Sequence, residues 1–237
     1  MSKRYKKSNL LTYAIGVSPV IECLNFRSSN IEKIVLSPKG DKNTGIKKIK
    51  EKCKELNIPI ETNQRTVGKI SLSENTYAVA IIRKYKTTLN KNANHVVLLN
   101  PSDMGNLGTI CRTMLGLNFI DLAIITPSVD VFDPKVLRAS MGSIFSLNIE
   151  MFKSLEDYTE RFKHNIYLFI GDGNLKLEET KFKQPYSLVF GNEGSGIDNK
   201  YKKMGETIRL TQNNKVDSFN LSVAVGIALY EVNIKSL

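Results

Sequence analysis

The stretch Leu188-Val-Phe-Gly191-Asn-Glu193-Gly-Ser-Gly196-Ile197 runs from an apolar, strand-like pattern directly into a loop that holds three glycines within six residues. Glycines let a loop approach a ligand closely through its backbone. The loop is not a P-loop, because no Gly-Lys-Ser/Thr follows, and it lacks the Gly-x-Gly-x-x-Gly fingerprint of dinucleotide-binding folds. Open α/β sheets bind ligands where their strands end, so we expect a binding site at this junction.

Two further stretches place small polar residues at similar junctions. The first, Asp103–Thr113, follows an apolar run and contains Asn106 and Arg112. Asn106 is predicted to cap the helix that follows, and Arg112 lies within two turns on the same helix, so both could line one cleft. The second stretch is Ser218–Ala224, in which Ser218 or Asn220 is predicted to cap an apolar helix. Taken singly, each stretch is a weak signal, and an ordinary cap or turn is the alternative explanation.

Strand and helix patterns alternate from residue 95 onward, which predicts an α/β fold with a mostly parallel sheet covered on both faces. The predicted strands are His95–Leu99, Ile120–Ile125, Asn165–Ile170, Tyr186–Phe190 and Thr207–Leu210. The predicted helices are Asn106–Leu117, Pro134–Ile144, Leu155–Lys163 and Phe219–Val232.

The N-terminal part shows a shorter α/β alternation, which predicts a small domain of helices packed on a sheet. Its predicted helices are Val17–Leu24 and Thr44–Leu56, and its predicted strands are Ile34–Leu36, Ile58–Ile60 and Tyr77–Ile82. Residues 83–94 are polar and lack periodicity. We therefore expect a domain at 1–88, a linker at 89–94 and a second domain at 95–237.

The net charge of +11 is concentrated in the N-terminal part. Residues 1–93 hold 19 Lys and Arg against 7 Asp and Glu, a balance of +12, whereas residues 94–237 hold 15 against 16, a balance of −1. A positive field of this kind attracts polyanions, of which nucleic acid is the common example. A lysine-rich, solvated surface is the alternative, and the asymmetry between the two parts favours contact with RNA.

Composition argues against several classes of protein. Three widely spaced cysteines and two isolated histidines among the 237 residues predict neither structural disulfides nor a metal site. His95 heads a strand-like run and is interpreted as structural. No apolar run is long enough to cross a bilayer, and no apolar segment follows the basic start, so we expect a cytoplasmic protein.

Taken together and in this order, the three stretches resemble the motifs of the SpoU (TrmH-type) RNA 2′-O-ribose methyltransferases of the SPOUT superfamily. The resemblance covers about residues 95–232. It depends on the spacings of Asn106, Gly108 and Arg112, of Gly191, Glu193, Gly194 and Gly196, and of Ser218, Asn220 and Ser222. The chain departs from the usual pattern at Met104, Arg209 and Phe219, where the family commonly has Pro, Pro and Leu.

The resemblance implies a trefoil-knotted methyltransferase domain that binds S-adenosylmethionine, needs no metal and forms a homodimer. The implied catalytic residues are Arg112, Asn106 and Glu193. The implied cofactor-binding residues are Phe190, Gly191, Gly196, Ile208, Leu210, Ser218 and Asn220. Because arginine keeps its proton far above neutral pH, the expected role of Arg112 is to orient the ribose hydroxyl and stabilise the developing alkoxide.

The expected substrate is RNA, recognised by phosphate and shape through the basic N-terminal part. Candidate contacts are Lys3, Arg4, Lys6, Lys7, Lys47, Lys48 and Lys52. The family resemblance favours ribose 2′-hydroxyls of large-subunit ribosomal RNA. The alternatives are a tRNA 2′-O-methyltransferase, a non-catalytic RNA-binding ribosome-associated factor, and a base methyltransferase of the wider superfamily.

Overall fold

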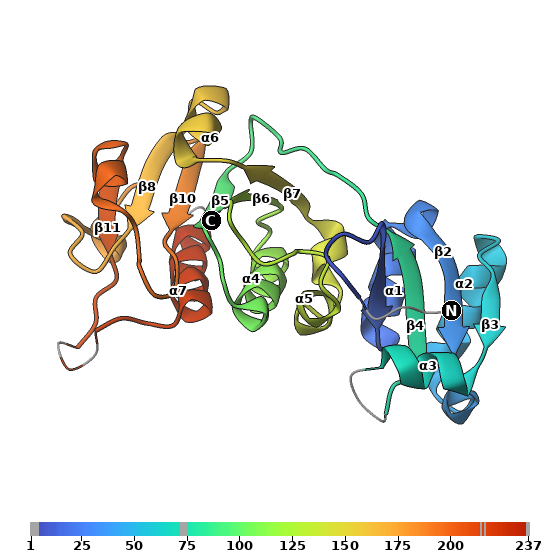
Figure 1. The fold of residues 1–237 in the computed structure, drawn as a ribbon. Helices are drawn as coiled ribbons and strands as arrows, with labels where there is room; N and C mark the ends of the chain where they lie inside the picture. Colours follow the sequence, from blue (N-terminus) through green and yellow to red (C-terminus); the bar gives the residue numbers. More distant parts are fainter. Residues whose placement is uncertain (1–4, 72–74, 214, 216, 236–237) are drawn as a thin grey trace. The chain divides into compact units, whose positions relative to one another are not determined.

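The computed structural model describes residues 5–71, 75–213, 215 and 217–235. The chain packs into two compact units that interleave along the sequence (Figure 1). Unit 1 comprises Met1–Tyr85, Leu107–Arg112 and Asp130–Ser146. Unit 2 comprises Lys86–Asn106, Thr113–Val129 and Leu147–Leu237. The boundaries 1–88, 89–94 and 95–237 stay predictions.

Unit 2 is built on a seven-stranded sheet in which every neighbouring pair of strands is parallel. In spatial order the strands are β7 (Asn148–Phe152), β6 (Asp121–Ile125), β5 (His95–Leu99), β10 (Tyr186–Phe190), β8 (Asn165–Phe169), β11 (Glu206–Arg209) and β9 (Leu175–Lys176). This sheet confirms the predicted α/β class, while the trefoil knot stays an expectation from the resemblance.

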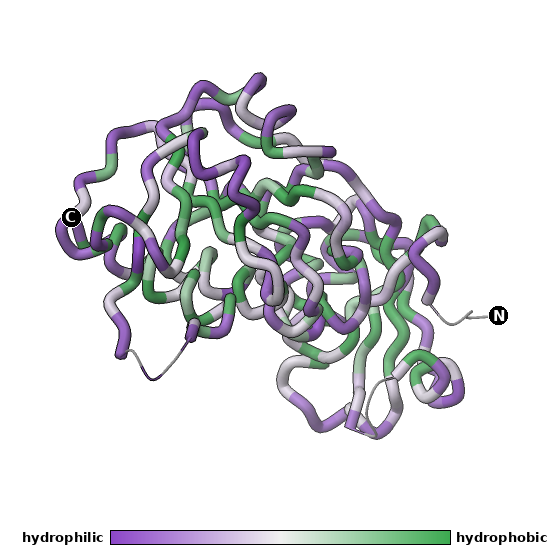
Figure 2. Tube along the Cα trace, turned by 60° about the vertical axis from the view of Figure 1, so that its left-hand side comes forward, coloured by the Kyte–Doolittle hydropathy of each residue, from purple (hydrophilic) through white to green (hydrophobic). Residues whose placement is uncertain are grey.

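The central strands of this sheet are buried along their whole length, as a parallel sheet covered on both faces requires. Figure 2 shows hydrophobic segments of the chain, in green, running through the interior. The helices that lie in unit 2 include α6 (Leu155–Arg161) and α7 (Leu221–Ile234), together with the 3-10 turns η4 (Leu177–Glu179) and η5 (Asn199–Lys203). The ends of α4 (Met104–Gly116) also belong to unit 2.

Unit 1 holds a mixed four-stranded sheet in the order β1 (Leu11–Ile15), β4 (Ala78–Arg83), β2 (Ile31–Leu36) and β3 (Ile60–Thr62). Only the β2–β3 pair is parallel. The helices of this unit are α1 (Val17–Phe26), α2 (Thr44–Glu55), α3 (Gln64–Ile70) and α5 (Pro134–Ala139), and its 3-10 turns are η1 (Ser28–Asn30), η2 (Pro38–Gly40) and η3 (Ser143–Ser146). Strand β1 and helix α3 were not predicted.

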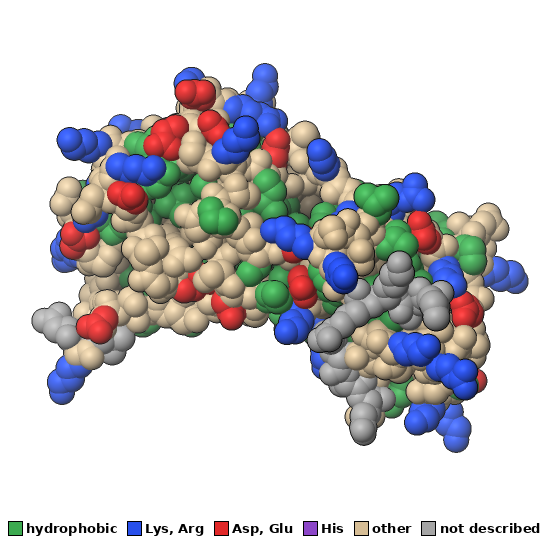
Figure 3. Space-filling view, in the orientation of Figure 1, with side chains coloured by type: hydrophobic (Ala, Val, Ile, Leu, Met, Phe, Trp, Pro, Cys, Tyr) green, Lys and Arg blue, Asp and Glu red, His purple; other side chains and the backbone are tan. Residues whose placement is uncertain are grey.

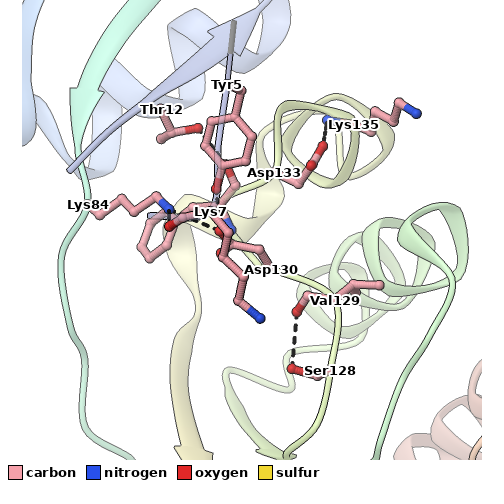
Figure 4. A network of polar contacts seen from close by, with 10 residues as sticks. Tyr5, Lys7, Thr12, Lys84, Ser128, Val129, Asp130, Asp133 and Lys135 are labelled. Carbon is pink, nitrogen blue, oxygen red and sulfur yellow. Dashed lines mark hydrogen bonds and ion pairs between the residues drawn. The ribbon is translucent and has the colours of Figure 1, made fainter. Parts of the chain in front are cut away.

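A polar network joins the N-terminal segment to the segment around residue 130 within unit 1 (Figure 4). The Tyr5 hydroxyl donates to the Asp130 carboxylate, and Lys84 Nζ pairs with the same carboxylate at 2.9 Å. The hydroxyl of the buried Thr12 donates to Phe132 O at 2.5 Å. The first strand of unit 1 is therefore anchored to residues that lie more than 100 positions away in the sequence.

All six predicted helices differ from the structure by one or more residues at an end, and two of these differences have a clear physical cause. The helix predicted over Pro134–Ile144 ends at Ala139, because Met141 and Gly142 have positive φ angles of 53° and 89° that interrupt it. Helix α4 begins at Met104 rather than Asn106. Its cap is Asp103, whose Oδ1 accepts from Asn106 N, so the prediction that Asn106 caps this helix is wrong.

Within the described residues, no helix is both long and apolar enough to pass through a membrane.

Candidate active site

A pocket of about 780 Å³ lies at the carboxyl ends of the parallel strands of unit 2. The loops that follow β5, β8, β10 and β11 supply its walls, together with the start of α7. All seven predicted cofactor-binding residues line it: Phe190, Gly191, Gly196, Ile208, Leu210, Ser218 and Asn220. The structure thus brings together residues that lie up to 30 positions apart in the sequence (190 to 220).

The glycine-rich loop closes on itself through its backbone. Asn192 N donates to Gly196 O and Gly196 N donates to Asn192 O, both at 3.0 Å. The Asn192 side chain reinforces the turn, since its Oδ1 accepts from Gly194 N at 2.9 Å and from Ser195 N at 3.1 Å. Gly196 has a φ of 66°, in the left-handed region that favours glycine.

Gly191 is fixed by a different constraint, because a side chain at this position has no room. A Cβ atom built on Gly191 lies 2.5 Å from Gly196 O and 2.7 Å from Ile197 N. At Gly194 the nearest atom to such a Cβ, Asn192 Oδ1, is 3.6 Å away. The loop therefore needs glycine at 191 for close backbone approach and tolerates a methyl group at 194.

The Glu193 carboxylate ties the glycine-rich loop to the loop before α4. It accepts from Ser102 N at 3.1 Å, Ser102 Oγ at 2.8 Å and Asp103 N at 3.2 Å, and from Asn106 Nδ2 at 3.3 Å. Partial burial raises the pKa of Glu193, but these hydrogen bonds outweigh it and hold the pKa below its usual value. The carboxylate therefore stays ionised at neutral pH and serves as an acceptor only.

Asn220 links the start of α7 to the same group of side chains. Its Nδ2 donates to Asn106 Oδ1 at 3.0 Å, while its Oδ1 accepts from Ser222 N at 2.9 Å and caps the helix. Of the two predicted cap residues, Ser218 and Asn220, the structure uses Asn220. One hydrogen-bonded chain, Glu193 to Asn106 to Asn220, therefore joins the three stretches that the sequence singled out.

Arg112 lies on the exposed side of α4 and belongs to unit 1, and it is not among the residues that line the pocket. In the described part of the chain, its guanidinium makes neither a hydrogen bond nor an ion pair. It is thus available to a bound molecule, and its catalytic role stays a prediction.

The candidate RNA contacts differ in exposure, and two of them cannot be placed. Lys3 and Arg4 lie outside the described residues. Lys6, Lys7, Lys47 and Lys48 are exposed, and Lys52 is half-buried. Figure 3 shows lysine and arginine side chains spread over the visible face of unit 1.

Sequence reasoning missed several polar residues of the pocket. Lys202 Nζ pairs with the Asp172 carboxylate at 3.0 Å, and both line the pocket. The ion pair holds the pKa of Asp172 below its usual value. Asp172 follows β8, so the rule that ligands bind at strand ends could have found it, whereas nothing in the sequence marks Lys202.

His95 is structural, in line with the interpretation from the sequence. The side chain is fully buried, and its Nδ1 lies 2.7 Å from the Tyr158 hydroxyl while its Nε2 lies 2.9 Å from Asn90 O. Burial lowers the pKa of His95, so the ring is neutral at physiological pH. Its place at the amino end of β5 is remote in the sheet from the pocket.

Solved structures with this fold cover almost the whole chain. The crystal structure of the SpoU methyltransferase AviRb from Streptomyces viridochromogenes has a TM-score of 0.82 at 20% identity, over 95% of this chain and 90% of the other. An AdoMet-bound rRNA methyltransferase from Sinorhizobium meliloti has a TM-score of 0.80 at 23% identity, over 96% of this chain and 88% of the other. These similarities establish the fold.

Sequence relatives match a little over half of the chain. An uncharacterized tRNA/rRNA methyltransferase of Synechocystis is 32% identical over 57% of this chain and 51% of its own length. The 23S rRNA (uridine(2479)-2′-O)-methyltransferase of Streptomyces viridochromogenes is 30% identical over 57% and 50%. A putative tRNA (cytidine(34)-2′-O)-methyltransferase of Bacillus subtilis is 33% identical over 58% and 89%.

The match spans about half the length of the first two of these relatives. The family comparison differs from these pairwise matches, because it tests for a domain that many proteins share. The SpoU rRNA Methylase family matches residues 93–230, more than half of the 237 residues, and contains all three stretches that meet at the pocket. This chain belongs to the SpoU rRNA Methylase family.

Proposed function

We propose that this chain is an S-adenosylmethionine-dependent RNA methyltransferase that methylates a ribose 2′-hydroxyl. The observation that carries the proposal is the hydrogen-bonded chain from Glu193 through Asn106 to Asn220 at the mouth of one pocket. Because the chain belongs to the SpoU rRNA Methylase family, we interpret this arrangement as part of a methyl-transfer site.

The pocket has the features that a bound S-adenosylmethionine requires. Its volume of about 780 Å³ falls in the range of small-molecule sites. Phe190, Ile208 and Leu210 offer apolar surface for an adenine ring, and the polar groups of Ser218 and Asn220 lie beside them. When bound, the cofactor supplies an electrophilic sulfonium methyl group, so the protein has to position the acceptor rather than activate the donor.

The side chains divide that task. Glu193 and the backbone of residues 102–103 fix the loop geometry, and Asn106 is held from both sides by Glu193 and Asn220. Arg112 carries the charge that orients the ribose hydroxyl through the adjacent phosphate and stabilises the alkoxide as its proton leaves. Placing these groups in advance contributes to the rate because little reorganisation is needed during the reaction.

Large-subunit ribosomal RNA is the favoured substrate, and tRNA is the second candidate. The relatives are divided in the same way, since one is named for 23S rRNA and another for tRNA. The deciding experiment incubates the full chain with labelled S-adenosylmethionine and, separately, unmethylated 23S rRNA, assembled large subunits or bulk tRNA, and then maps 2′-O-methyl sites. Label in ribosomal RNA supports the proposal, and label confined to tRNA selects the second candidate.

The same assay tests the two remaining alternatives. Cofactor binding without transfer to any RNA would identify a non-catalytic RNA-binding factor, and label on a base would identify a base methyltransferase. The fixed position of Asn106 between Glu193 and Asn220 and the exposed Arg112 favour an active enzyme over the non-catalytic factor.

A homodimer formed through α7 is the proposed assembly. Val223, Ile227, Tyr230 and Ile234 recur at helical spacing and remain 47%, 40%, 59% and 47% exposed. An apolar stripe of this kind on one helix marks a surface that another molecule covers. The start of the same helix lies at the pocket, so a second copy on this face would approach both sites.

Ile227→Asp should convert a dimer into a monomer, because a charge buried in an apolar interface is strongly unfavourable. Sedimentation velocity at micromolar concentration measures the change. Met151→Asp on β7 is the matched control, since Met151 is exposed to a similar degree, 42% against 40%. A monomeric native chain, or a dimer that persists in Ile227→Asp, would contradict the proposed interface.

RNA binding by α2 should appear as a salt effect. Lys47, Lys48 and Lys52 form no ion pair in the described part of the chain and are free to contact phosphates. Each phosphate contact adds roughly 0.7 to 0.9 to the slope of log affinity against log salt. Replacing all three lysines by glutamine should therefore lower the slope by about 2.

The control for this measurement replaces the exposed Lys153, Lys163 and Lys181 of unit 2, which removes the same charge. Equal slopes for the two triple variants would show that the lysines of α2 only solvate the surface. Substitution is preferred to deletion of residues 1–90, because Thr12 contacts Phe132 and Tyr5 contacts Asp130 within unit 1. Deletion of residues 1–90 would remove Tyr5 and Thr12 and leave Asp130 and Phe132 without these contacts.

A further inference from the structure

A row of polar side chains joins the two histidines of the chain inside unit 2. His95 Nδ1 lies 2.7 Å from the Tyr158 hydroxyl, and that hydroxyl lies 2.6 Å from Ser187 Oγ. Ser187 Oγ in turn lies 3.0 Å from His164 Nδ1. Three internal contacts therefore connect one imidazole ring to the other through two hydroxyl groups. None of these four side chains lines the candidate active site, and the proposed methyl transfer does not use them.

Both ends of the row stop at backbone carbonyl groups. His95 Nε2 lies 2.9 Å from Asn90 O, and His164 Nε2 lies 3.0 Å from Lys91 O. A carbonyl oxygen only accepts hydrogen bonds, so each Nε2 atom has to carry the proton of its contact. A neutral imidazole has a single ring proton, so this contact fixes the tautomer of each ring. When the rings are neutral, both Nδ1 atoms are therefore acceptors.

The row has one proton fewer than its contacts require when both rings are neutral. The three internal contacts then have to share two protons, one from the Tyr158 hydroxyl and one from Ser187 Oγ. Burial raises the pKa of Tyr158, so its hydroxyl keeps this proton. One contact would place two acceptors opposite each other, which is unfavourable away from solvent. A second proton on one of the two rings completes all three contacts.

The surroundings favour His164 over His95 as the ring that holds this second proton. His95 is fully buried, and desolvation lowers its pKa, whereas His164 is half-buried and remains in contact with solvent. The ring centroids are 4.5 Å apart, so a charge on one ring opposes a charge on the other. With the proton on His164, each group donates to the next, from His164 through Ser187 and Tyr158 to His95.

Charged side chains surround the row. The carboxylates of Asp121 on β6 and Glu150 on β7 act on His95 and favour a positive charge nearby. Arg161 of α6 pairs with Glu150 at 2.5 Å and offsets part of that effect. The neighbours of the row along the chain are the exposed Lys91 and Lys163. Two carboxylates thus face the row from the sheet, which supports one positive charge within it.

We propose that these four side chains form a proton-sensitive clamp, in which His164 carries a second ring proton at neutral pH and donates it to Ser187. Loss of that proton as the pH rises removes one hydrogen bond of the row. The clamp fastens α6 to β5 and β10, because Tyr158 lies between His95 and Ser187. The inference rests on these contacts and does not depend on the proposed methyl transfer.

Nitrogen NMR of the full, tag-free chain tests the clamp. The chain holds two histidines, and long-range proton–nitrogen spectra distinguish a neutral ring from an imidazolium. An imidazole of ordinary pKa, about 6.5, is roughly 90% neutral at pH 7.5. At this pH we expect one imidazolium and one neutral ring that is protonated at Nε2. Two neutral rings in the native chain would overturn the proposal.

Ser187→Ala is the decisive variant, because it removes two of the three internal contacts and, with them, the need for the second proton. The Tyr158 hydroxyl can then donate to His95, and both rings should be neutral at pH 7.5. The matched control is Ser146→Ala, since Ser146 Oγ is buried and has no hydrogen-bond partner in the described part of the chain. The control should keep one imidazolium. An imidazolium that persists in Ser187→Ala would show that another interaction holds the proton.

His164→Gln assigns the two signals and carries little risk to folding, because His164 is half-buried. The side chains that remain have enough protons for their contacts with His95 neutral. The imidazolium signal should disappear, and the remaining ring should be neutral with its proton on Nε2. An imidazolium at His95 in this variant would contradict the placement of the charge on His164.

Stability should depend on the same proton. The folded row holds a proton that the unfolded chain binds weakly at neutral pH, so the stability it contributes is present at low pH and is lost as the pH rises. The urea midpoint of the native chain should therefore exceed that of Ser187→Ala by more at pH 6.5 than at pH 9. The burial of His95 has the opposite effect, but it is common to both chains. A difference that is equal at both pH values would overturn the clamp.

Discussion

Arg112→Ala should lose methyl transfer by about 100-fold or more, while its affinity for S-adenosylmethionine stays near that of the native chain. The magnitude is that of removing one positioned group that stabilises charge in the transition state. Cofactor affinity should persist because Arg112 does not line the pocket. Single-turnover transfer to the RNA substrate measures the rate, and calorimetry measures cofactor binding.

Two variants define what Arg112 contributes. Arg112→Lys keeps the charge but loses the planar fork, so partial recovery of the rate separates charge from geometry. Lys163→Ala removes a positive charge from an exposed site of unit 2 and controls for non-specific loss of RNA attraction. A normal transfer rate in Arg112→Ala would show that the catalytic assignment is wrong.

Gly191→Ala should reduce cofactor affinity by roughly tenfold to 100-fold, because the added methyl group meets the backbone of residues 196–197 and forces the loop apart. The nearest atoms include Gly196 O at 2.5 Å and Ile197 N at 2.7 Å, neither of which belongs to a flexible side chain. Overpacking of this kind costs about 1–3 kcal/mol. Calorimetric titration with S-adenosylhomocysteine measures the loss.

Gly194→Ala is the matched control, since it adds the same methyl group in the same loop. There the nearest atom is 3.6 Å away, which is ordinary van der Waals contact. The control should retain most of the affinity that Gly191→Ala loses. Similar losses in both variants would mean that chain flexibility, and not close backbone approach at Gly191, sets the affinity.

Local patterns in the sequence were enough for the central strands of the parallel sheet. Strands β5 and β10 were predicted with their observed bounds, because central parallel strands are continuous apolar runs between turn signals. Strand β7 was not predicted. It lies at the edge of the sheet and is mostly half-buried, so Asn148–Phe152 shows neither a continuous apolar run nor clean alternation.

The cap of α4 was decided by competition between two neighbouring side chains, and the end of α5 by backbone conformation. Both Asp103 and Asn106 are suitable cap residues, and the structure uses Asp103. Asn106 is thereby free to contact Glu193 and Asn220. The helix from Pro134 ends early because Met141 and Gly142 take left-handed conformations that no periodicity reveals.

The sequence by itself determined the α/β class and the three junctions, because strand ends and glycine-rich turns are local signals. The seven predicted cofactor-binding residues came from the family resemblance, and all seven are among the residues that line the candidate pocket. Only the tertiary structure decided that Glu193, Asn106 and Asn220 form one hydrogen-bonded chain, and that the Asp121 carboxylate accepts from Asn90 N and Asn148 Nδ2 at the opposite edge of the sheet. Both depend on contacts between residues 27 to 114 positions apart. Those contacts form only when the parallel strands align, since a carboxylate or amide has no preferred distant partner until packing excludes water around it.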